Sequence, residues 1–155
     1  MTGDRLNVRR AHIGDTAVLN ELFVQLGYPQ DAPGATASRI QSWSEDPAGA
    51  ALVAEADGKV LGVVAVHVCP YLERPGSWGR IVALVVSDRA RRQGVAGRLV
   101  AAAEAFAESR GCVRMEVTSA NRRDDAHGFY RSRGYADQSE RSSRFLRELG
   151  GPGGS

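Results

Sequence analysis

The most informative segment of the chain spans residues 85–99 and reads VVSDRARRQGVAGRL. It leads from an apolar strand through a charged loop into a helix that begins at Val95. The first N–H groups of a helix have no partner inside the helix, and they point out of its end. Gly94 and the small residues after it let an anion approach this backbone closely. The segment therefore predicts a phosphate-binding turn between a strand and a helix.

The spacing within this turn separates it from two common phosphate-binding motifs. It has neither the Gly-x4-Gly-Lys-Ser/Thr of a Walker loop nor the Gly-x-Gly-x-x-Gly of a dinucleotide-binding fold. It fits the pattern Arg/Gln-x-x-Gly-x-Gly/Ala, as Arg91-x-x-Gly94-x-Ala96. The nearby arginines that can add charge-assisted hydrogen bonds are Arg89, Arg91, Arg92 and Arg98. The alternative interpretation is a plain glycine-containing helix start with solvated arginines.

The elements on either side of the turn predict an α/β fold. A β-α-β unit, which is expected to be right-handed, is formed by strand 80–86, helix 95–109 and strand 113–118. Strand 80–86 is apolar enough to be covered on both faces. Residues 51–56 and 60–68 form a hairpin, because Asp-Gly between two β-prone runs is a strong turn signal. Hairpins and helical crossovers together predict one domain built on a mixed sheet. The remaining predicted elements are a strand at 5–11, helices at 15–26, 35–44 and 124–134, and closing strands at 135–136 and 144–149.

Composition narrows the class of protein. The chain has 155 residues, of which 43% are hydrophobic and 25% are charged, and this composition is typical of a globular domain. We expect one domain over residues 1–149, followed by a flexible glycine-rich tail over residues 150–155. A net charge of +2 is too small to indicate nucleic acid as a partner. Two cysteines make neither a disulfide framework nor a structural zinc site, so no metal is expected. The chain lacks a long apolar run and an apolar signal core in residues 1–10, so we expect a cytoplasmic protein with no membrane partner.

A second motif lies downstream and reads DAHGFYRSRGY, residues 125–135. Together with the turn at Gly94, it resembles the GNAT superfamily of acetyl-CoA-dependent N-acetyltransferases. The second motif of that family, Ala-x-x-Phe-Tyr-x-x-x-Gly-Phe/Tyr, matches at every fixed position, and the likeness covers most of the chain. The resemblance implies a GNAT-like domain with a mostly antiparallel sheet of about six or seven strands and about four helices. It is also compatible with a homodimer.

The resemblance implies a binding site for acetyl-CoA as co-substrate. Successive backbone amides of the turn would hold the pyrophosphate, and strand 84–86 would pair with the pantetheine arm through its backbone. Asn121 lies five residues before Ala126, whereas many members have an asparagine only three before, so its predicted contact requires a longer turn. The predicted cofactor-binding residues are Leu84, Val85, Val86, Arg91, Arg92, Gln93, Gly94, Val95, Ala96, Gly97, Arg98, Asn121 and Tyr130.

Tyr130 is the predicted general acid, because the resemblance places this hydroxyl beside the sulfur that leaves as a thiolate. The alternative is a tyrosine that packs on the sheet. The general base is open, since strand 79–86 lacks the carboxylate that several members carry there. Glu116 is the predicted base, while Glu73, or a chain of water molecules, is an alternative. His67 fits a hydrogen-bonded interior histidine better than a base.

The predicted acceptor is a primary amine of a small molecule or a peptide. In the family it is framed by segments that correspond here to residues 26–47 and 138–143, and these contain no acidic cluster that would indicate a polycationic acceptor. Two other functions fit the same motifs. One is a non-catalytic acyl-CoA-binding or regulatory module, and the other is a nucleotide-phosphate binder unrelated to coenzyme A.

Overall fold

The computed structural model describes residues 6–28, 33–90, 93–118 and 124–150. Two compact units are present, residues 1–118 and residues 119–155, and each is described by itself. The first unit contains all five strands that the structure describes and three α-helices, and the second contains one helix. The elements are β1 (Asn7–Arg10), α1 (Thr16–Gln25), α2 (Pro33–Glu45), β2 (Gly49–Ala56), β3 (Lys59–Pro70), β4 (Ser77–Val86), α3 (Val95–Ser109), β5 (Cys112–Val117) and α4 (Asp124–Ser132).

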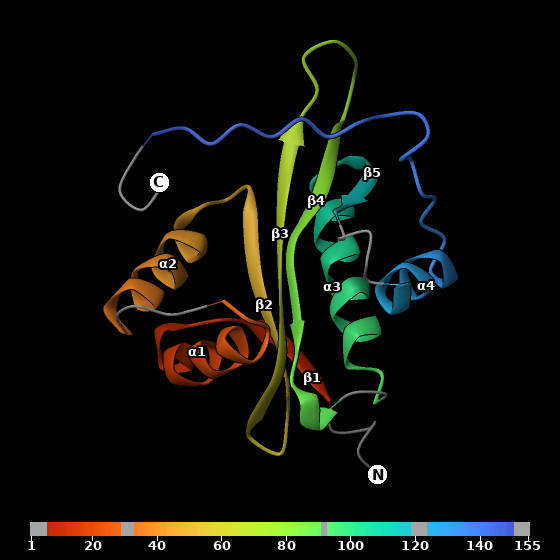
Figure 1. Ribbon diagram of the computed structural model, residues 1–155. Helices are drawn as coiled ribbons and strands as arrows, with labels where there is room; N and C mark the ends of the chain where they lie inside the picture. Colours follow the sequence, from red (N-terminus) through yellow and green to blue (C-terminus); the bar gives the residue numbers. More distant parts are fainter. Residues whose placement is uncertain (1–5, 29–32, 91–92, 119–123, 151–155) are drawn as a thin grey trace. The chain divides into compact units, whose positions relative to one another are not determined.

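The strands form one mixed sheet in the order β1-β2-β3-β4-β5 (Figure 1). Neighbours are antiparallel except β4 and β5, which are parallel and are joined through α3. The predicted β-α-β unit is therefore confirmed. The hairpin between β2 and β3 is confirmed as well, since both turn residues, Asp57 and Gly58, have the positive φ that a tight Asp-Gly turn requires.

Helices cover both faces of the sheet in the first unit. Helices α1 and α2 lie on one face and α3 lies on the other (Figure 1). The core under α1 and α2 joins the helices to apolar side chains of β2, β3 and β4, with Leu22, Ile40 and Val63 among its members. On the opposite face, Leu99 of α3 is fully buried. Burial of apolar side chains on both faces supplies most of the driving force for this packing.

Gly62 of β3 permits the close approach of α3 to the sheet. A Cβ built there would lie 2.9 Å from the Val85 carbonyl oxygen, 3.0 Å from the Leu99 side chain and 3.2 Å from the Val95 side chain. We expect Gly62→Ala to lower the free energy of unfolding by about 1–3 kcal/mol, because backbone and packed side chains must move apart. Urea unfolding measures this, with Gly34→Ala as the control, since the space around Gly34 is open. Equal stability of both variants would contradict the close approach.

Strand β4 carries a bulge at Val82. In the register with β3, Ala65 pairs with Ala83 and Val66 pairs with Ile81, which leaves Val82 as the extra residue. Val82 is 54% exposed and Arg80 is also exposed, so the prediction of a strand covered on both faces was wrong for this half of β4. The physical reason is that a bulge shifts the alternation of faces and turns its extra residue outward.

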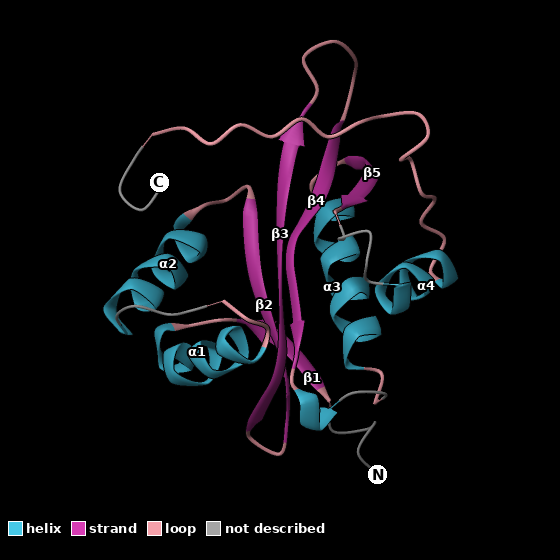
Figure 2. Cartoon of the chain, in the orientation of Figure 1, coloured by secondary structure: helices cyan, strands magenta, loops and turns pink. Residues whose placement is uncertain are grey.

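The predicted closing strands 135–136 and 144–149 are not strands, and residues 133–150 are irregular (Figure 2). The described residues therefore form five strands rather than six or seven. The amide of Tyr135 donates to the Tyr130 carbonyl at 3.0 Å and, with Gly134 at φ 90°, completes the end of α4. Phe145 is 94% exposed. An extended segment becomes a strand only when it forms a ladder with another strand.

Candidate active site

The edge of β4 that faces β5 is only partly paired. In the parallel ladder, the first pair is Ser77 of β4 with Cys112 of β5, and the last pair is Ile81 with Val117. Val117 is also the last residue of β5. On the other side, β4 pairs with β3 as far as Val86. Within the described residues, positions 82–86 therefore have no strand on the β5 side. The predicted contacts Leu84, Val85 and Val86 lie on this stretch, whose backbone groups can pair with an extended ligand.

Helix α3 begins directly after this strand and its loop. Gly94 is the residue before the helix, with φ 78°, and a Cβ built there would meet nothing within 4 Å. The first helical bond runs from the Arg98 N–H to the Gly94 carbonyl at 3.1 Å. The N–H groups of Val95, Ala96 and Gly97 lie in the first turn of the helix, before this bond. The N–H groups of a first turn have no acceptor inside the helix. These three amides, together with the helix dipole, suit an anion.

Backbone hydrogen bonds to β3 and within the loop hold the described residues before the helix. The Ser87 N–H donates to the Leu61 carbonyl at 2.8 Å, and the Ala90 N–H donates to the Ser87 carbonyl at 2.9 Å. The amide of Gln93 donates to the Ala90 carbonyl at 3.3 Å, so this predicted phosphate donor already has a partner inside the loop. The described parts of the loop, residues 87–90 and 93–94, are therefore fixed by backbone hydrogen bonds, and the donors that suit a ligand begin at Val95.

The predicted basic partners are only partly described. Arg91, Arg92 and Asn121 lie outside the described residues, so their predicted contacts stay predictions. Arg98 is exposed, and its Nη2 donates to the Leu6 carbonyl at 2.9 Å. A guanidinium has five N–H donors, so this bond anchors the side chain and leaves others for a phosphate. Arg89 is also exposed.

Three strands bring polar side chains into one row across the sheet. His67 of β3 pairs in register with Arg80 of β4, which pairs with Glu116 of β5. The Arg80 Nε lies 3.8 Å from the Glu116 Oε1, and both side chains are about half exposed. Glu116, the predicted base, is thus an exposed carboxylate in an ion pair. Glu73, the alternative, is exposed beside Arg74, with a 3.9 Å separation.

His67 is hydrogen bonded, as an interior histidine would be, but its side chain is 37% exposed. Its Nε2 lies 3.1 Å from the Asp46 Oδ2. The backbone N–H of Ala48 and the side chain of His67 both lower the pKa of Asp46, which keeps it a carboxylate. Asp46 lies directly before Pro47, where an aspartate is typical of a turn, and the sequence contains no signal for its contact with His67.

Tyr130 belongs to the second unit and lies on α4. Its ring makes edge contacts with Phe129, at 5.2 Å between centroids, and with Tyr135, at 5.8 Å. The side chain is partly exposed. The motif thus builds an aromatic cluster at the end of α4, which holds the Tyr130 ring in one orientation. Its role as a general acid stays a prediction.

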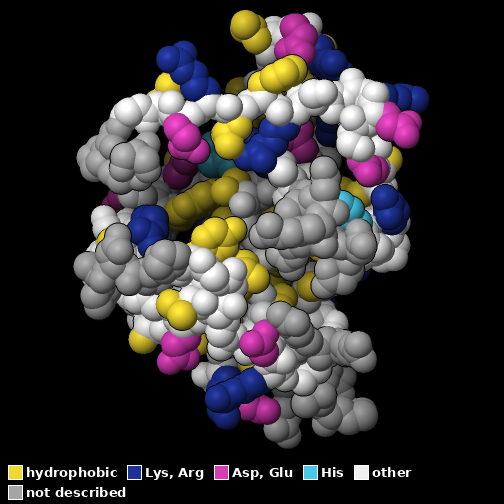
Figure 3. Space-filling model, viewed as in Figure 1, with side chains coloured by type: hydrophobic (Ala, Val, Ile, Leu, Met, Phe, Trp, Pro, Cys, Tyr) yellow, Lys and Arg dark blue, Asp and Glu magenta, His cyan; other side chains and the backbone are white. Residues whose placement is uncertain are grey.

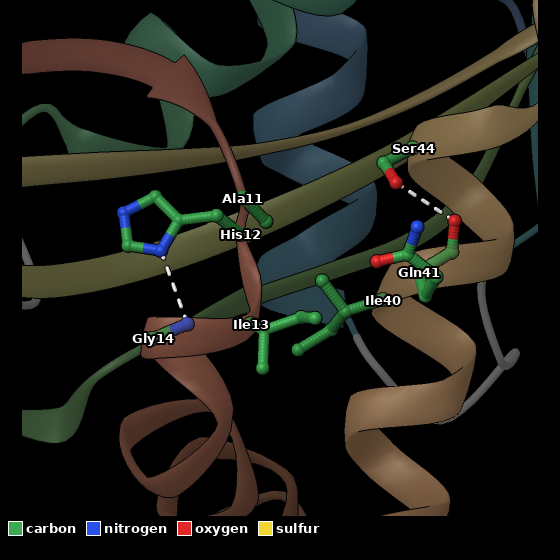
Figure 4. A pocket seen from close by; sticks show the side chains of 7 residues that line it. All are labelled: Ala11, His12, Ile13, Gly14, Ile40, Gln41 and Ser44. Atoms are coloured by element: carbon green, nitrogen blue, oxygen red, sulfur yellow. Dashed lines mark hydrogen bonds between the residues drawn. The ribbon is translucent and has the colours of Figure 1, made fainter.

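A hollow of about 360 Å³ lies between the start of α1 and α2 (Figure 4). Its polar groups serve local structure, because His12 Nδ1 accepts from the Gly14 N–H and the Ser44 hydroxyl donates to the Gln41 carbonyl. These two hydrogen bonds stabilise the segments that line the hollow. The lining residues are Ala11, His12, Ile13, Gly14, Ile40, Gln41 and Ser44.

Charges on the described surface are mixed. On the face in Figure 3, basic and acidic side chains alternate and do not gather into one basic patch. In the described parts of the chain, no group of three metal-ligating side chains is found. No helix there is long and apolar enough to cross a membrane.

Comparison with known proteins connects this geometry to a family. The sequence model of the acetyltransferase (GNAT) family matches residues 12–135. The aminoalkylphosphonate N-acetyltransferase of Salmonella typhimurium strain LT2 is 32% identical over 90 residues, which is 58% of each protein. A GNAT family acetyltransferase of Staphylococcus aureus subsp. aureus USA300_TCH1516 matches with a TM-score of 0.76 at 23% identity, over 96% of this chain and 100% of that chain. The glucosamine-6-phosphate N-acetyltransferase of Arabidopsis thaliana matches with 0.78 at 21% identity, over 92% and 99%.

The match over most of the chain shows that this protein belongs to the GNAT acetyltransferase family. The family is one of acyltransferases, and both solved structures share its fold with this chain. The chain matches little more than half the length of the Salmonella relative. The resemblance that the two sequence motifs indicated is therefore confirmed at the level of family and fold.

Proposed function

We propose that this protein is an N-acetyltransferase that moves the acetyl group of acetyl-CoA directly to a primary amine of a small molecule or peptide. One observation carries the proposal. Residues 82–86 of β4, which have no strand on the β5 side within the described part of the chain, lead through a loop to the first amides of α3. An extended ligand that ends in a diphosphate needs this order of features, a strand edge and then a helix N-terminus.

The residues present fit acetyl-CoA in two respects. The open space around Gly94 leaves room for a diphosphate, and the amides of Val95, Ala96 and Gly97 are the donors that would bind it. When bound, acetyl-CoA supplies the activated acetyl thioester. A backbone N–H near Val86, on the free edge of β4, would polarise the acetyl carbonyl. Holding amine and thioester together supplies a further part of the rate.

Proton transfer completes the proposed reaction. Tyr130 would donate a proton to the departing sulfur as the general acid. Glu116, or a water molecule, would accept the proton of the amine. The ion pair with Arg80 favours water, because it gives Glu116 a structural role on the sheet. No covalent acetyl-enzyme is needed for direct transfer.

The Salmonella relative supports a small-molecule acceptor. The Salmonella relative is an N-acetyltransferase for aminoalkylphosphonates, which are small amines that carry an anionic group. For this chain, that likeness favours a small-molecule amine over a peptide. Exposed Arg80 lies on the same row as Glu116 and could pair with an acidic group of such an acceptor.

The diphosphate site is tested by Ala96→Glu. A carboxylate at the start of α3 repels a diphosphate, while it interacts favourably with the helix dipole, so the fold should stay intact. We expect calorimetry to show coenzyme A binding weakened by about tenfold or more, which corresponds to about 1.4 kcal/mol or more. Thermal unfolding should show unchanged or slightly higher stability.

Ala101→Glu is the matched control, because Ala101 is exposed on the same helix and adds the same charge away from its start. Equal affinity of both variants for coenzyme A would overturn the assignment of the site. Tight binding of coenzyme A without turnover across a broad panel of amines would instead support a non-catalytic acyl-CoA-binding module.

A further inference from the structure

Near one end of β3, the side chains of a cysteine, a histidine and an aspartate form a chain of polar contacts. The Cys69 Sγ lies 4.0 Å from the His67 Nδ1, and the His67 Nε2 lies 3.1 Å from the Asp46 Oδ2. Cys69 and His67 are two residues apart on β3, so both side chains point to the same face of the sheet. All three side chains are at least partly accessible. A thiol, a base and a group that orients the base are the parts of an activated nucleophile.

The surroundings of His67 determine which ring nitrogen faces the thiol. The Ala48 N–H donates to the Asp46 Oδ1 at 2.9 Å, which leaves the Oδ2 directed at the His67 Nε2. In the neutral imidazole, the Asp46 carboxylate accepts from the Nε2–H, and Nδ1 then presents its lone pair to Cys69. The ring of Trp43 meets His67 edge-on at 6.0 Å, and a Cβ at Gly49 would lie 3.1 Å from the His67 ring. The imidazole is therefore held in place from three sides.

We propose that Cys69 is a reactive thiol, activated by His67 and Asp46, that exchanges with small-molecule disulfides. In this step the Cys69 proton moves to the His67 Nδ1, and the thiolate sulfur attacks one sulfur of the disulfide. The disulfide bond breaks, a bond forms between Cys69 and one half, and the other half leaves as a thiolate that takes up the proton. The products are a mixed disulfide and one small thiol, with no net change in electrons.

The reaction stops at the mixed disulfide, because the second cysteine is too far away to react with it. Cys69 pairs with Trp78 of β4, and Cys112 of β5 pairs with Ser77 of β4, so a whole strand separates the two cysteines. Two strand spacings place their Cα atoms about 10 Å apart, beyond the reach of a disulfide. Cys112 therefore cannot displace the small thiol from Cys69. Arg80 lies opposite His67 and is paired with Glu116.

The test is the rate of labelling of each cysteine in the native full-length chain. The probe is the anionic aromatic disulfide 5,5′-dithiobis(2-nitrobenzoate) at neutral pH, and peptide mass spectrometry reports the adduct at each position. Burial raises the pKa of Cys112, with a smaller contribution from Cys69, so Cys112 is an internal reference of low thiolate content. We expect Cys69 to react about tenfold faster than Cys112, as an activated thiol does relative to a thiol whose pKa is raised. Cys112→Ser should keep the fast reaction, and Cys69→Ser should remove it.

Two variants separate activation from simple exposure. His67→Gln and Asp46→Asn leave Cys69 accessible but remove the base or its orienting partner, so each should slow Cys69 several-fold and leave Cys112 unchanged. Circular dichroism checks the fold of each variant. If His67→Gln does not fold, Asp46→Asn is the deciding variant, because the Asp46 side chain is 43% exposed and its replacement should leave the fold intact. Equal labelling of both cysteines in the native chain, or a Cys69 rate that the folded variants do not change, would overturn the proposal.

Discussion

We expect Tyr130→Phe to lower kcat by about 100-fold, which is the contribution typical of a positioned general acid. The substitution removes the hydroxyl and keeps the ring, which packs against Phe129 and Tyr135. The fold of α4 should therefore change little, and the loss in kcat should exceed any loss in affinity for coenzyme A. The measurement is steady-state turnover of an active amine with acetyl-CoA, combined with calorimetry of coenzyme A.

Tyr135→Phe is the matched control for this experiment. It removes a hydroxyl from the neighbouring ring of the same cluster, and either aromatic residue fits the family motif at that position. We expect its kcat to stay close to that of the unchanged protein. If Tyr130→Phe kept full turnover, the proton donor would have to be another group, while the assignment to the family would stand.

The second large effect is expected at Asp15, which joins β1 to the start of α1. Both its carboxylate oxygens accept from the Arg9 guanidinium at 2.9 Å, and the His12 N–H donates to Oδ2 at 2.9 Å. The Asp15 side chain is 6% exposed. We expect Asp15→Asn to lower the free energy of unfolding by about 2–3 kcal/mol, because it leaves Arg9 without half of its ion pairing and disrupts the bidentate contact.

The same contact makes stability depend on pH. Burial by itself would raise the pKa of Asp15, but the hydrogen bonds from Arg9 and from His12 outweigh burial and lower it. The folded-state pKa thus lies below the unfolded value of about 3.9, so this contribution is present above about pH 4. It is lost as the pH falls through the folded-state pKa.

Urea unfolding at neutral pH and at about pH 3 measures both effects. The difference in stability between the unchanged protein and Asp15→Asn should be large at neutral pH and smaller in acid. Glu108→Gln is the control, since Glu108 is exposed on α3 and should change stability by about 0.5 kcal/mol or less. A difference that did not shrink in acid would mean that packing, rather than charge, makes Asp15 important.

Local chemistry made much of this protein predictable from its residues. The start of α3 at Val95 follows from the apolar spacing after Gly94, and the turn at Asp57-Gly58 follows from the positive φ that these residues accept. The two motifs indicated the family because each depends on residues close together in the chain. These features are short-range, so periodicity and turn chemistry are enough to find them.

Long-range pairing decided the rest. The bulge at Val82 and the end of the β4–β5 ladder at Ile81 depend on the register between strands, and an unbroken apolar run contains no signal for either. The closing segment 144–149 has the composition of a strand but no ladder. The contact of Asp46 with His67 joins residues 21 positions apart, and only folding brings them together. Side-chain patterns indicate which segments can pair, whereas partners and register are set by packing against the whole sheet.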